Sequence, residues 1–210
     1  MGDIRIGRMT IGVCATNSYF LYRDGAAEVI VFDPADRGRD IFKALQNKGF
    51  SVAAILLTHG HFDHIWGAEE LRQLSGAKIY ALDAEKTVCG DAYVNISAQM
   101  KRKCTIEPDG WLTDGEEITF ADICLKVIAT PGHTMGSCCF YSKEAGLLIS
   151  GDTLFEESVG RTDFPTGSMS KLVRSIKEKL FVLPEETKVY PGHGDMTTIG
   201  REKQYNPYCQ

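Results

Sequence analysis

Three of the five histidines of this chain lie within six consecutive positions, in a Thr-His-Gly-His-Phe-Asp-His segment that ends at His64. If the segment is extended, the side chains of His59 and His61 project to the same side, because alternate residues share a face. Asp63 and His64 return toward the same space as the chain turns into a helix. Imidazole and carboxylate are ligands that suit Zn²⁺, iron and manganese. The segment therefore predicts four metal ligands; hydrogen-bonded turn histidines are the disfavoured alternative.

Two further histidines, His133 and His193, each follow a Pro-Gly pair at the end of an apolar run. Pro-Gly ends a strand sharply and directs the next residue outward, so both are expected to join the metal ligands. Asp152 follows the apolar run 147–151. A carboxylate at the end of a buried strand is costly unless it is hydrogen-bonded or bound to a metal. Asp152 is therefore expected to bridge metal ions, with a helix cap or turn residue as the alternative.

Short apolar runs bounded by Gly and Pro predict the strands that would position these side chains. The expected strands are Asn17–Tyr22, Glu28–Phe32, Val52–Leu57, Lys78–Ala81, Glu117–Phe120, Cys124–Ala129, Ser137–Tyr141, Gly146–Ser150 and Lys188–Tyr190. The expected helices are Asp36–Lys48, one that opens near Asp63 and runs past Leu74, and Met169–Leu180. Two halves that each give strands and then a helix predict an α/β fold, a four-layer αββα sandwich with its sheets packed face to face.

The 210 residues show no internal repeat and no Pro/Gly/Ser-rich linker, so a single domain over residues 1–210 is expected. The net charge of −5 gives no electrostatic footprint for nucleic acid or for an anionic membrane surface. The chain also lacks a signal-peptide core and any run of the ~20 apolar residues that a membrane span needs. We therefore expect a soluble cytoplasmic protein with no nucleic-acid or membrane partner.

The seven cysteines are an odd number and show no C-x-x-C spacing. Several lie inside apolar runs, as in Ser-Cys-Cys-Phe-Tyr141. They are expected to be buried thiols in a reducing compartment, and a redox or metal role for one of them is the alternative.

The order of these motifs resembles that of the metallo-β-lactamase superfamily over nearly the whole chain: H-x-H-x-D-H ending at His64, G-H-T at His133, G-D at Asp152 and G-H at His193. The Val-Gly-Arg-Thr-Asp-Phe-Pro segment at 159–165 is similar to the glyoxalase II-like (hydroxyacylglutathione hydrolase-like) thioesterase branch, and in part to the persulfide dioxygenases. Asp152 departs from the lactamase subclass that has Cys there, so this resemblance disfavours β-lactamase activity. An H-x-H rather than an H-x-E opening likewise disfavours the flavodiiron branch.

The resemblance implies two divalent metal ions, zinc first, with iron or manganese as alternatives. The implied ligands are His59, His61 and His133 for one metal and Asp63, His64 and His193 for the other, with Asp152 and a water or hydroxide bridging the two. The implied reaction is hydrolysis of a thioester of a small thiol, of the S-lactoylglutathione type, by the metal-bridging hydroxide. Asp63 would also orient the nucleophilic water, so Asp63 and Asp152 are the expected catalytic residues.

Two features bear on the substrate, expected to be a small acyl-thiol. Glyoxalase II proper has a helical domain after its last metal-binding histidine that grips glutathione, whereas 17 residues follow His193 here. The resemblance is therefore to the short, single-domain bacterial members, with glutathione or another small thiol as the leaving group. Arg161 and Asp163 either orient the substrate or, as favoured, tie their loop to nearby groups. The residues expected at the mouth of the site are Phe155, Phe164 and Tyr93.

Three other functions remain open. A persulfide dioxygenase would use one iron, with His59, His133 and Asp152 as the matching ligands. A lactonase or a phosphodiesterase would use the same two-metal set, although the negative net charge disfavours RNA as a substrate. A metal store would need a closed coordination sphere, which a water-bridged site does not have. The sequence makes no prediction of the oligomeric state.

Overall fold

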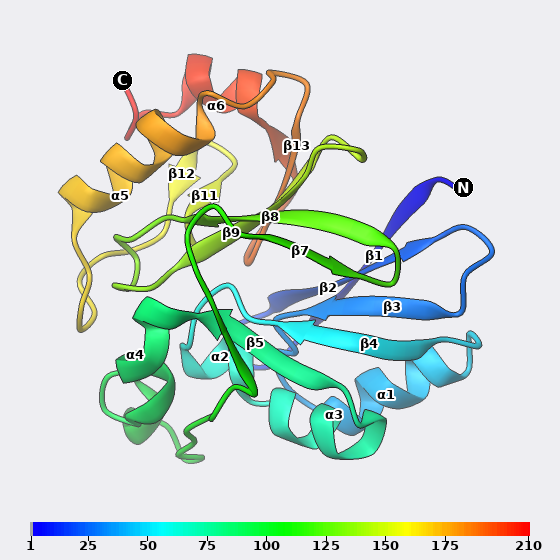
Figure 1. The fold of residues 1–210 in the computed structure, drawn as a ribbon. Helices are drawn as coiled ribbons and strands as arrows, with labels where there is room; N and C mark the ends of the chain where they lie inside the picture. The colour runs from blue at the N-terminus through cyan, green and yellow to red at the C-terminus, as the bar shows by residue number, and fades with distance from the viewer. Residues whose placement is uncertain (1) are drawn as a thin grey trace.

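Two six-stranded sheets face each other at the centre of the molecule, as Figure 1 shows for the computed structural model, which describes residues 2–210. The first sheet has the order β1-β2-β3-β4-β5-β6. Its strands are β1 (Ile4–Ile11), β2 (Thr16–Arg23), β3 (Glu28–Phe32), β4 (Ser51–Leu56), β5 (Lys78–Leu82) and β6 (Gly110–Leu112). The pairs from β1 to β3 are antiparallel and those from β3 to β6 are parallel.

The second sheet has the order β14-β13-β10-β9-β8-β7. Its strands are β7 (Glu117–Phe120), β8 (Ile123–Ala129), β9 (Cys138–Ser142), β10 (Leu147–Gly151), β13 (Lys188–Pro191) and β14 (Thr197–Thr198). All its pairs are antiparallel except β10 with β13, which are parallel and bring Gly151 opposite Pro191. A small hairpin of β11 (Leu154–Phe155) and β12 (Ser158–Val159) follows β10.

Helices cover the outer side of each sheet (Figure 1). The helices and single turns of the first half are α1 (Gly38–Gln46), α2 (Phe62–Ile65), α3 (Ala68–Ser75), η1 (Asp83–Glu85), α4 (Lys86–Gly90) and η2 (Ser97–Gln99). Those of the second half are α5 (Met169–Ser175), the π-helical turn η3 (Ile176–Leu180) and α6 (Ile199–Tyr205). The predicted four-layer αββα sandwich is confirmed. Within residues 2–210, no helix has the length and apolar character to cross a membrane.

Strand β2 shows how the sequence builds the layers, because its alternate side chains enter different cores. Tyr19 and Leu21 lie between the sheets, where they meet Phe140 of the second sheet. Phe20 points to the opposite side and joins the core beneath α1, which includes Ile41. Each such buried side chain contributes roughly 1.5–3 kcal/mol relative to an exposed one. Because this sheet is covered on both sides, its strands need apolar side chains on both faces.

Two predicted helices differ from those observed. The helix expected to run on from Asp63 is interrupted, and α2 and α3 are separate elements. The break lies at Gly67, whose backbone N–H donates to the carbonyl of Pro34. A Cβ atom at Gly67 would lie 2.8 Å from the carbonyl oxygens of Pro34 and Asp36, so this close approach requires glycine. The helix expected over Met169–Leu180 ends as the π-helical turn η3, where Phe181 N–H donates to the carbonyl of Ile176.

All seven cysteines are free thiols. The prediction that they are buried holds for Cys89, Cys138, Cys139 and Cys209. It is wrong for Cys14 and Cys124, which are exposed on a turn and on a strand with one face uncovered, and Cys104 is half-buried.

Candidate metal centre

The His59–His64 segment begins three residues after the end of β4 and ends inside α2. His61 is still extended (φ −62°, ψ 147°), and helical geometry begins at Phe62. His59 and His61 therefore face the same space, with their ring centroids 4.8 Å apart. Gly60 between them lies against α4, because a Cβ atom there would be 3.0 Å from the backbone nitrogen of Cys89. The candidate ligands His59 and His61 thus follow the carboxyl end of the parallel β4 strand.

The other three predicted ligands come from the ends of strands in the opposite sheet. His133 lies four residues after β8, Asp152 directly follows β10, and His193 lies two residues after β13. Because β10 and β13 are parallel neighbours, Asp152 and His193 emerge side by side. The ligand segments of both sheets meet at one end of the sandwich.

All seven predicted side chains converge there in three overlapping groups, within each of which the candidate ligand atoms lie within 4.8 Å of one another. The groups are His59, His61 and His133; His59, His64 and Asp152; and Asp63, His64 and His193. We call the first the three-histidine set and the last the Asp-His-His set.

The Asp152 carboxylate lies between the two sets. Its Oδ2 atom is 3.5 Å from Nε2 of both His133 and His193, and its Oδ1 atom is 3.4 Å from Nε2 of His64. In the Asp-His-His set, Asp63 Oδ2 is 3.3 Å from His193 Nε2. These separations suit atoms that share a cation more than atoms that hydrogen-bond one another directly.

The pattern of unpartnered atoms also fits metal ions. The buried atoms His59 Nε2, His64 Nε2 and Asp152 Oδ1 have no hydrogen-bond partner among the described residues. A buried polar atom without a partner costs about 1–3 kcal/mol, so a cluster of such atoms points to a bound group. Imidazole nitrogen and carboxylate oxygen are the donors that zinc, iron and manganese accept. The residues present therefore fit two divalent metal ions.

Three hydrogen bonds set which imidazole nitrogen faces the centre. His59 Nδ1 lies 3.1 Å from the Thr58 hydroxyl, and His133 Nδ1 lies 2.7 Å from the carbonyl oxygen of Arg161. His64 Nδ1 lies 2.9 Å from Oδ2 of the buried Asp33. With Nδ1–H donating in each case, Nε2 is the nitrogen that is directed toward the candidate metal centre, where His133 Nε2 lies 2.9 Å from His61 Nδ1.

Electrostatics divides the histidines into two kinds. Burial lowers the pKa of His61 to about 3, with His133 adding to the effect, and burial likewise lowers the pKa of His59 and of His133. These imidazoles are neutral at neutral pH, which is the form that binds metal. Burial also acts to lower the pKa of His193, but the adjacent carboxylates of Asp152 and Asp63 outweigh it and raise that pKa to about 9. A metal ion at the Asp-His-His set would therefore replace a proton.

Three supporting residues were not identified from the sequence. Asp33 directly follows β3 and accepts hydrogen bonds from Thr58 and His64. Its position after a buried strand is the signal that singled out Asp152, so it could have been found. Thr16 donates to Asp63 Oδ2 at 2.9 Å, and Asn17 donates to the carbonyls of Pro191 and Gly194 on either side of His193. Those contacts cross between distant segments and leave no local signal.

Of the three residues expected at the mouth of the site, Phe155 and Phe164 lie beside candidate metal ligands, whereas Tyr93 pairs with a lysine instead. The Phe164 ring lies edge-on to His61 (centroids 5.6 Å apart) and the Phe155 ring to His193 (6.2 Å). Tyr93 is exposed, and its ring pairs with the Lys103 ammonium instead. Arg161 forms an ion pair with Asp163, and its guanidinium lies 3.9 Å from the centre of the Phe164 ring.

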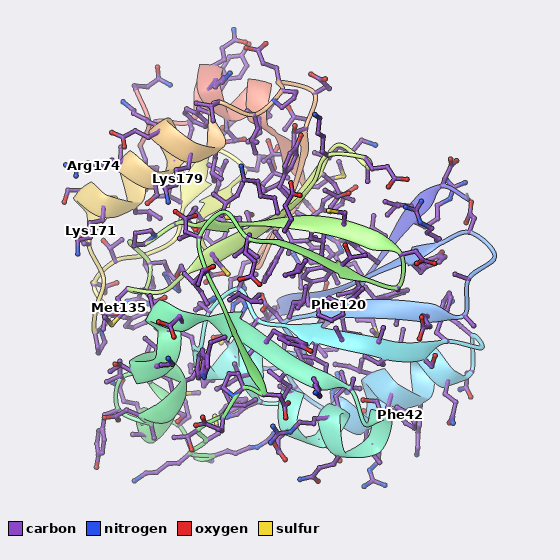
Figure 2. All side chains as sticks on the ribbon, in the orientation of Figure 1. Phe42, Phe120, Met135, Lys171, Arg174 and Lys179 are labelled. Atoms are coloured by element: carbon purple, nitrogen blue, oxygen red, sulfur yellow. The ribbon has the colours of Figure 1, made fainter. Side chains whose placement is uncertain are left out.

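Met135, two residues after His133, is exposed at the edge of the molecule on the side where Lys171 and Arg174 extend from α5 (Figure 2). The side chains of Phe42 and Phe120 lie toward the other end of the layers in that view. The metal-ligand segment that holds His133 thus leads directly to the molecular surface.

Comparison with known proteins bears on what such a centre does. A family model described as the metallo-beta-lactamase superfamily matches residues 11–193. The chain is 39% identical over 203 residues to the probable metallo-hydrolase YqgX of Bacillus subtilis, covering 96% of this chain and 95% of that protein. It is 31% identical over 189 residues to the hydroxyacylglutathione hydrolase GloC of Haemophilus influenzae, covering 88% and 89%.

Two solved structures are similar over almost their full lengths. The BLEG-1 B3 metallo-beta-lactamase has a TM-score of 0.92 and 36% identity, covering 98% of this chain and 99% of that chain. The structure of TTHA1623 in a di-iron-bound form has a TM-score of 0.85 and 32% identity, covering 96% and 99%.

Proposed function

Since this chain is a metallo-hydrolase that belongs to the metallo-beta-lactamase superfamily, we propose that it cleaves thioesters of small thiols. The observation that carries the proposal is the convergence of the three-histidine set and the Asp-His-His set on the shared carboxylate of Asp152. We assign the two sets to two metal ions, with Asp152 between them. The similarity to the hydroxyacylglutathione hydrolase GloC supports the choice of a thioester substrate.

Two divalent metal ions held there would supply a nucleophilic water at neutral pH, by lowering its pKa toward about 7, and would polarise the substrate carbonyl. The protein's own part is to fix the acidic groups around that water. Asp63 Oδ2 accepts a hydrogen bond from the Thr16 hydroxyl at 2.9 Å, which holds the carboxylate in one orientation. Asp63 is thus placed to orient the nucleophile.

Thioesters suit this centre because the leaving thiol has a pKa of about 8.5 and departs as a thiolate without a strong general acid. The acyl group would lie against the rings of Phe155 and Phe164, which contact the ligands His193 and His61. These rings shield the centre from bulk water on two sides and offer an apolar wall. A small acyl-thiol therefore matches both the chemistry and the lining of the site.

Zinc is our first assignment for the metal, because histidine and aspartate in this number suit it. Iron is the main alternative, since the similar TTHA1623 was solved in a di-iron-bound form. The exposed free thiols of Cys14 and Cys124 favour a reducing compartment, so we place the protein in the cytoplasm.

Hydrolysis of β-lactams is the second candidate, because the similar BLEG-1 is titled a B3 metallo-beta-lactamase. The ligand set alone does not separate an amide from a thioester as the bond that is cleaved. The acidity of the leaving group favours the thioester over the amide, since an amine leaves far less readily than a thiolate.

The test is a substrate panel with metal-free protein reconstituted separately with zinc and with iron. The panel contains S-lactoylglutathione, an acyl-coenzyme A, a lactone, a cephalosporin and an aryl phosphodiester, and oxygen uptake with glutathione persulfide is followed in parallel. We expect the highest kcat/KM for a thioester. Higher kcat/KM for the cephalosporin, the lactone or the phosphodiester, or oxygen uptake by a one-iron form, would contradict the proposal.

A further inference from the structure

Glu85, the last residue of η1, is a fully buried carboxylate directly behind the metal-ligand segments. Its Oε1 atom accepts a hydrogen bond from the backbone N–H of Gly60 at 2.9 Å. Its Oε2 atom accepts one from the hydroxyl of Thr134 at 2.9 Å, and the backbone N–H of Gly136 also donates to the carboxylate. One side chain thus receives donors from two segments that are far apart in the sequence.

Both segments belong to the three-histidine set. Gly60 is the residue between His59 and His61, and Thr134 directly follows His133. The Glu85 carboxylate therefore connects the backbone that carries all three of these ligands. The supports identified above for the Asp-His-His set are different residues, since Thr16 holds Asp63 and Asn17 holds the backbone on either side of His193.

The fit around Glu85 is close on both sides. A Cβ atom at Gly136 would lie 2.3 Å from the backbone nitrogen of Glu85 and 2.5 Å from its Oε2 atom. A Cβ atom at Gly60 would meet the first residues after Glu85, at 3.0 Å from the Cys89 backbone and 3.2 Å from a Val88 methyl. Glycine at both positions lets the two ligand segments approach the η1–α4 region directly.

Burial raises the pKa of Glu85 to about 7, against the three hydrogen bonds that favour its charged form. Burial of the charged carboxylate at this position is thus energetically unfavourable. Its distinctive property is that both oxygens accept hydrogen bonds at once, which a neutral amide of the same shape does not reproduce.

We propose that Glu85 is a positioning residue that sets the spacing of His59, His61 and His133, and so selectively supports metal binding at the three-histidine set. The proposal rests on the proposed function in one respect, namely that this set holds a metal ion. In a Glu85→Gln variant, whichever oxygen becomes the amide nitrogen, one ligand segment loses its acceptor. The Asp-His-His set keeps its own supports.

Glu202 provides a matched control. It is also a fully buried glutamate, and it also accepts three hydrogen bonds, from the Thr197 hydroxyl, the Glu157 backbone N–H and the Asn206 amide. Glu157 belongs to the turn of the β11–β12 hairpin, Thr197 belongs to β14 and Asn206 directly follows α6, and none of the three is a metal-ligand candidate. Glu202→Gln therefore reproduces the loss of a buried acceptor without touching the metal-ligand segments.

The experiment is a zinc titration of the metal-free full chain in competition with a chromophoric chelator, with Co²⁺ absorption spectra of the same variants. Wild type is expected to bind two equivalents. Glu85→Gln is expected to retain one equivalent with unchanged affinity and to bind the other about 10- to 100-fold more weakly, as found when a group that orients metal ligands is removed. Glu202→Gln is expected to bind both equivalents as wild type does, whatever its melting temperature.

A milder pair covers the case in which Glu85→Gln fails to fold. Thr134→Val removes one donor to Glu85, and Thr197→Val removes the corresponding donor to Glu202. The first is expected to weaken one zinc equivalent and the second neither. Equal zinc affinities of Glu85→Gln and Glu202→Gln, or of Thr134→Val and Thr197→Val, would overturn the role of Glu85. A wild type that binds fewer than two equivalents would instead contradict the proposed function, and the two failures are thereby distinguished.

Discussion

The Nδ1 atom of His64 lies 2.9 Å from the Oδ2 atom of Asp33, and both side chains are buried at the interface between a ligand segment and the end of β3. The same carboxylate accepts hydrogen bonds from the backbone N–H and the hydroxyl of Thr58, at 2.7 Å and 2.6 Å. Both of its oxygens are therefore acceptors, which keeps a proton on His64 Nδ1 and directs Nε2 toward the candidate metal centre.

Replacement of Asp33 by asparagine is expected to disturb this tautomer. An amide that keeps its oxygen toward the Thr58 N–H presents its NH₂ group to His64, which would then carry its proton on Nε2. We expect metal affinity to fall about 10- to 100-fold, measured by chelator competition. Asp109→Asn is the control, because that carboxylate accepts a hydrogen bond from the Ile79 N–H in a segment without ligands. Equal affinities of the two variants would contradict the role of Asp33.

Asp152→Asn is expected to abolish most of the hydrolysis. The amide lowers the negative charge between His64, His133 and His193, where the carboxylate oxygens lie 3.4–3.5 Å from the ring nitrogens. We expect kcat/KM to fall by more than about 100-fold, beyond the effect of losing a supporting group. Steady-state kinetics would show this, with Asp24→Asn, a surface carboxylate paired with Arg5, as the control. Retention of wild-type kcat/KM would contradict the assignment of Asp152 to the metal centre.

Gly192→Ala tests the close approach of the backbone to the ligands. A Cβ atom at Gly192 would lie 2.3 Å from Asp152 Oδ1 and 2.7 Å from His64 Cε1, so both side chains must move. Displacement of catalytic groups by about 1 Å can cost roughly 100-fold in rate, and we expect a loss of that order. Gly90→Ala has nothing within 4 Å of the added methyl and is expected to leave the kinetics unchanged. Similar rates for the two variants would contradict the geometry described here.

Metal binding is expected to release protons and to strengthen as the pH rises. Burial opposes the protonation of His193, but the adjacent carboxylates of Asp152 and Asp63 raise its pKa to about 9. Below that pH the ring is protonated in the metal-free protein, and a metal ion must displace the proton. Against the effect of burial, Asp152 and Asp63 also raise the pKa of His64 in the same set, so zinc affinity there should rise by at least about tenfold per pH unit up to pH 9. Calorimetry in two buffers with different ionisation enthalpies counts the protons; zero release would contradict this prediction.

The fold and the convergence of the candidate ligands were predictable from the sequence because their signals are local. Each candidate ligand lies in the compact H-x-H-x-D-H segment or within four residues after an apolar strand, so that the end of a strand marks its position. The strands themselves were predictable because a sheet covered on both sides requires continuous apolar runs. The sequence prediction lacks the short strands β6, β11, β12 and β14, and it lacks β1, although Ile4 and Ile6 alternate with polar residues as in an edge strand.

Apart from Asp33, the supporting residues could not be predicted in the same way because their partners are distant in the sequence. Glu85 accepts hydrogen bonds from Gly60 and Thr134, which lie 25 and 49 positions away. No spacing rule connects such positions before the two sheets are assembled. The helix break at Gly67 has a similar origin, since the close approach of the Pro34 carbonyl causes it.

The most direct test of the account is a titration of the metal-free protein with zinc while thioester hydrolysis is measured. Convergence of the two three-residue sets on the shared carboxylate of Asp152 predicts that activity rises with added zinc and reaches its maximum at two equivalents per chain. Full activity at one equivalent, or no thioester hydrolysis at two equivalents, would contradict the assignment of this site as a two-metal thioester hydrolase.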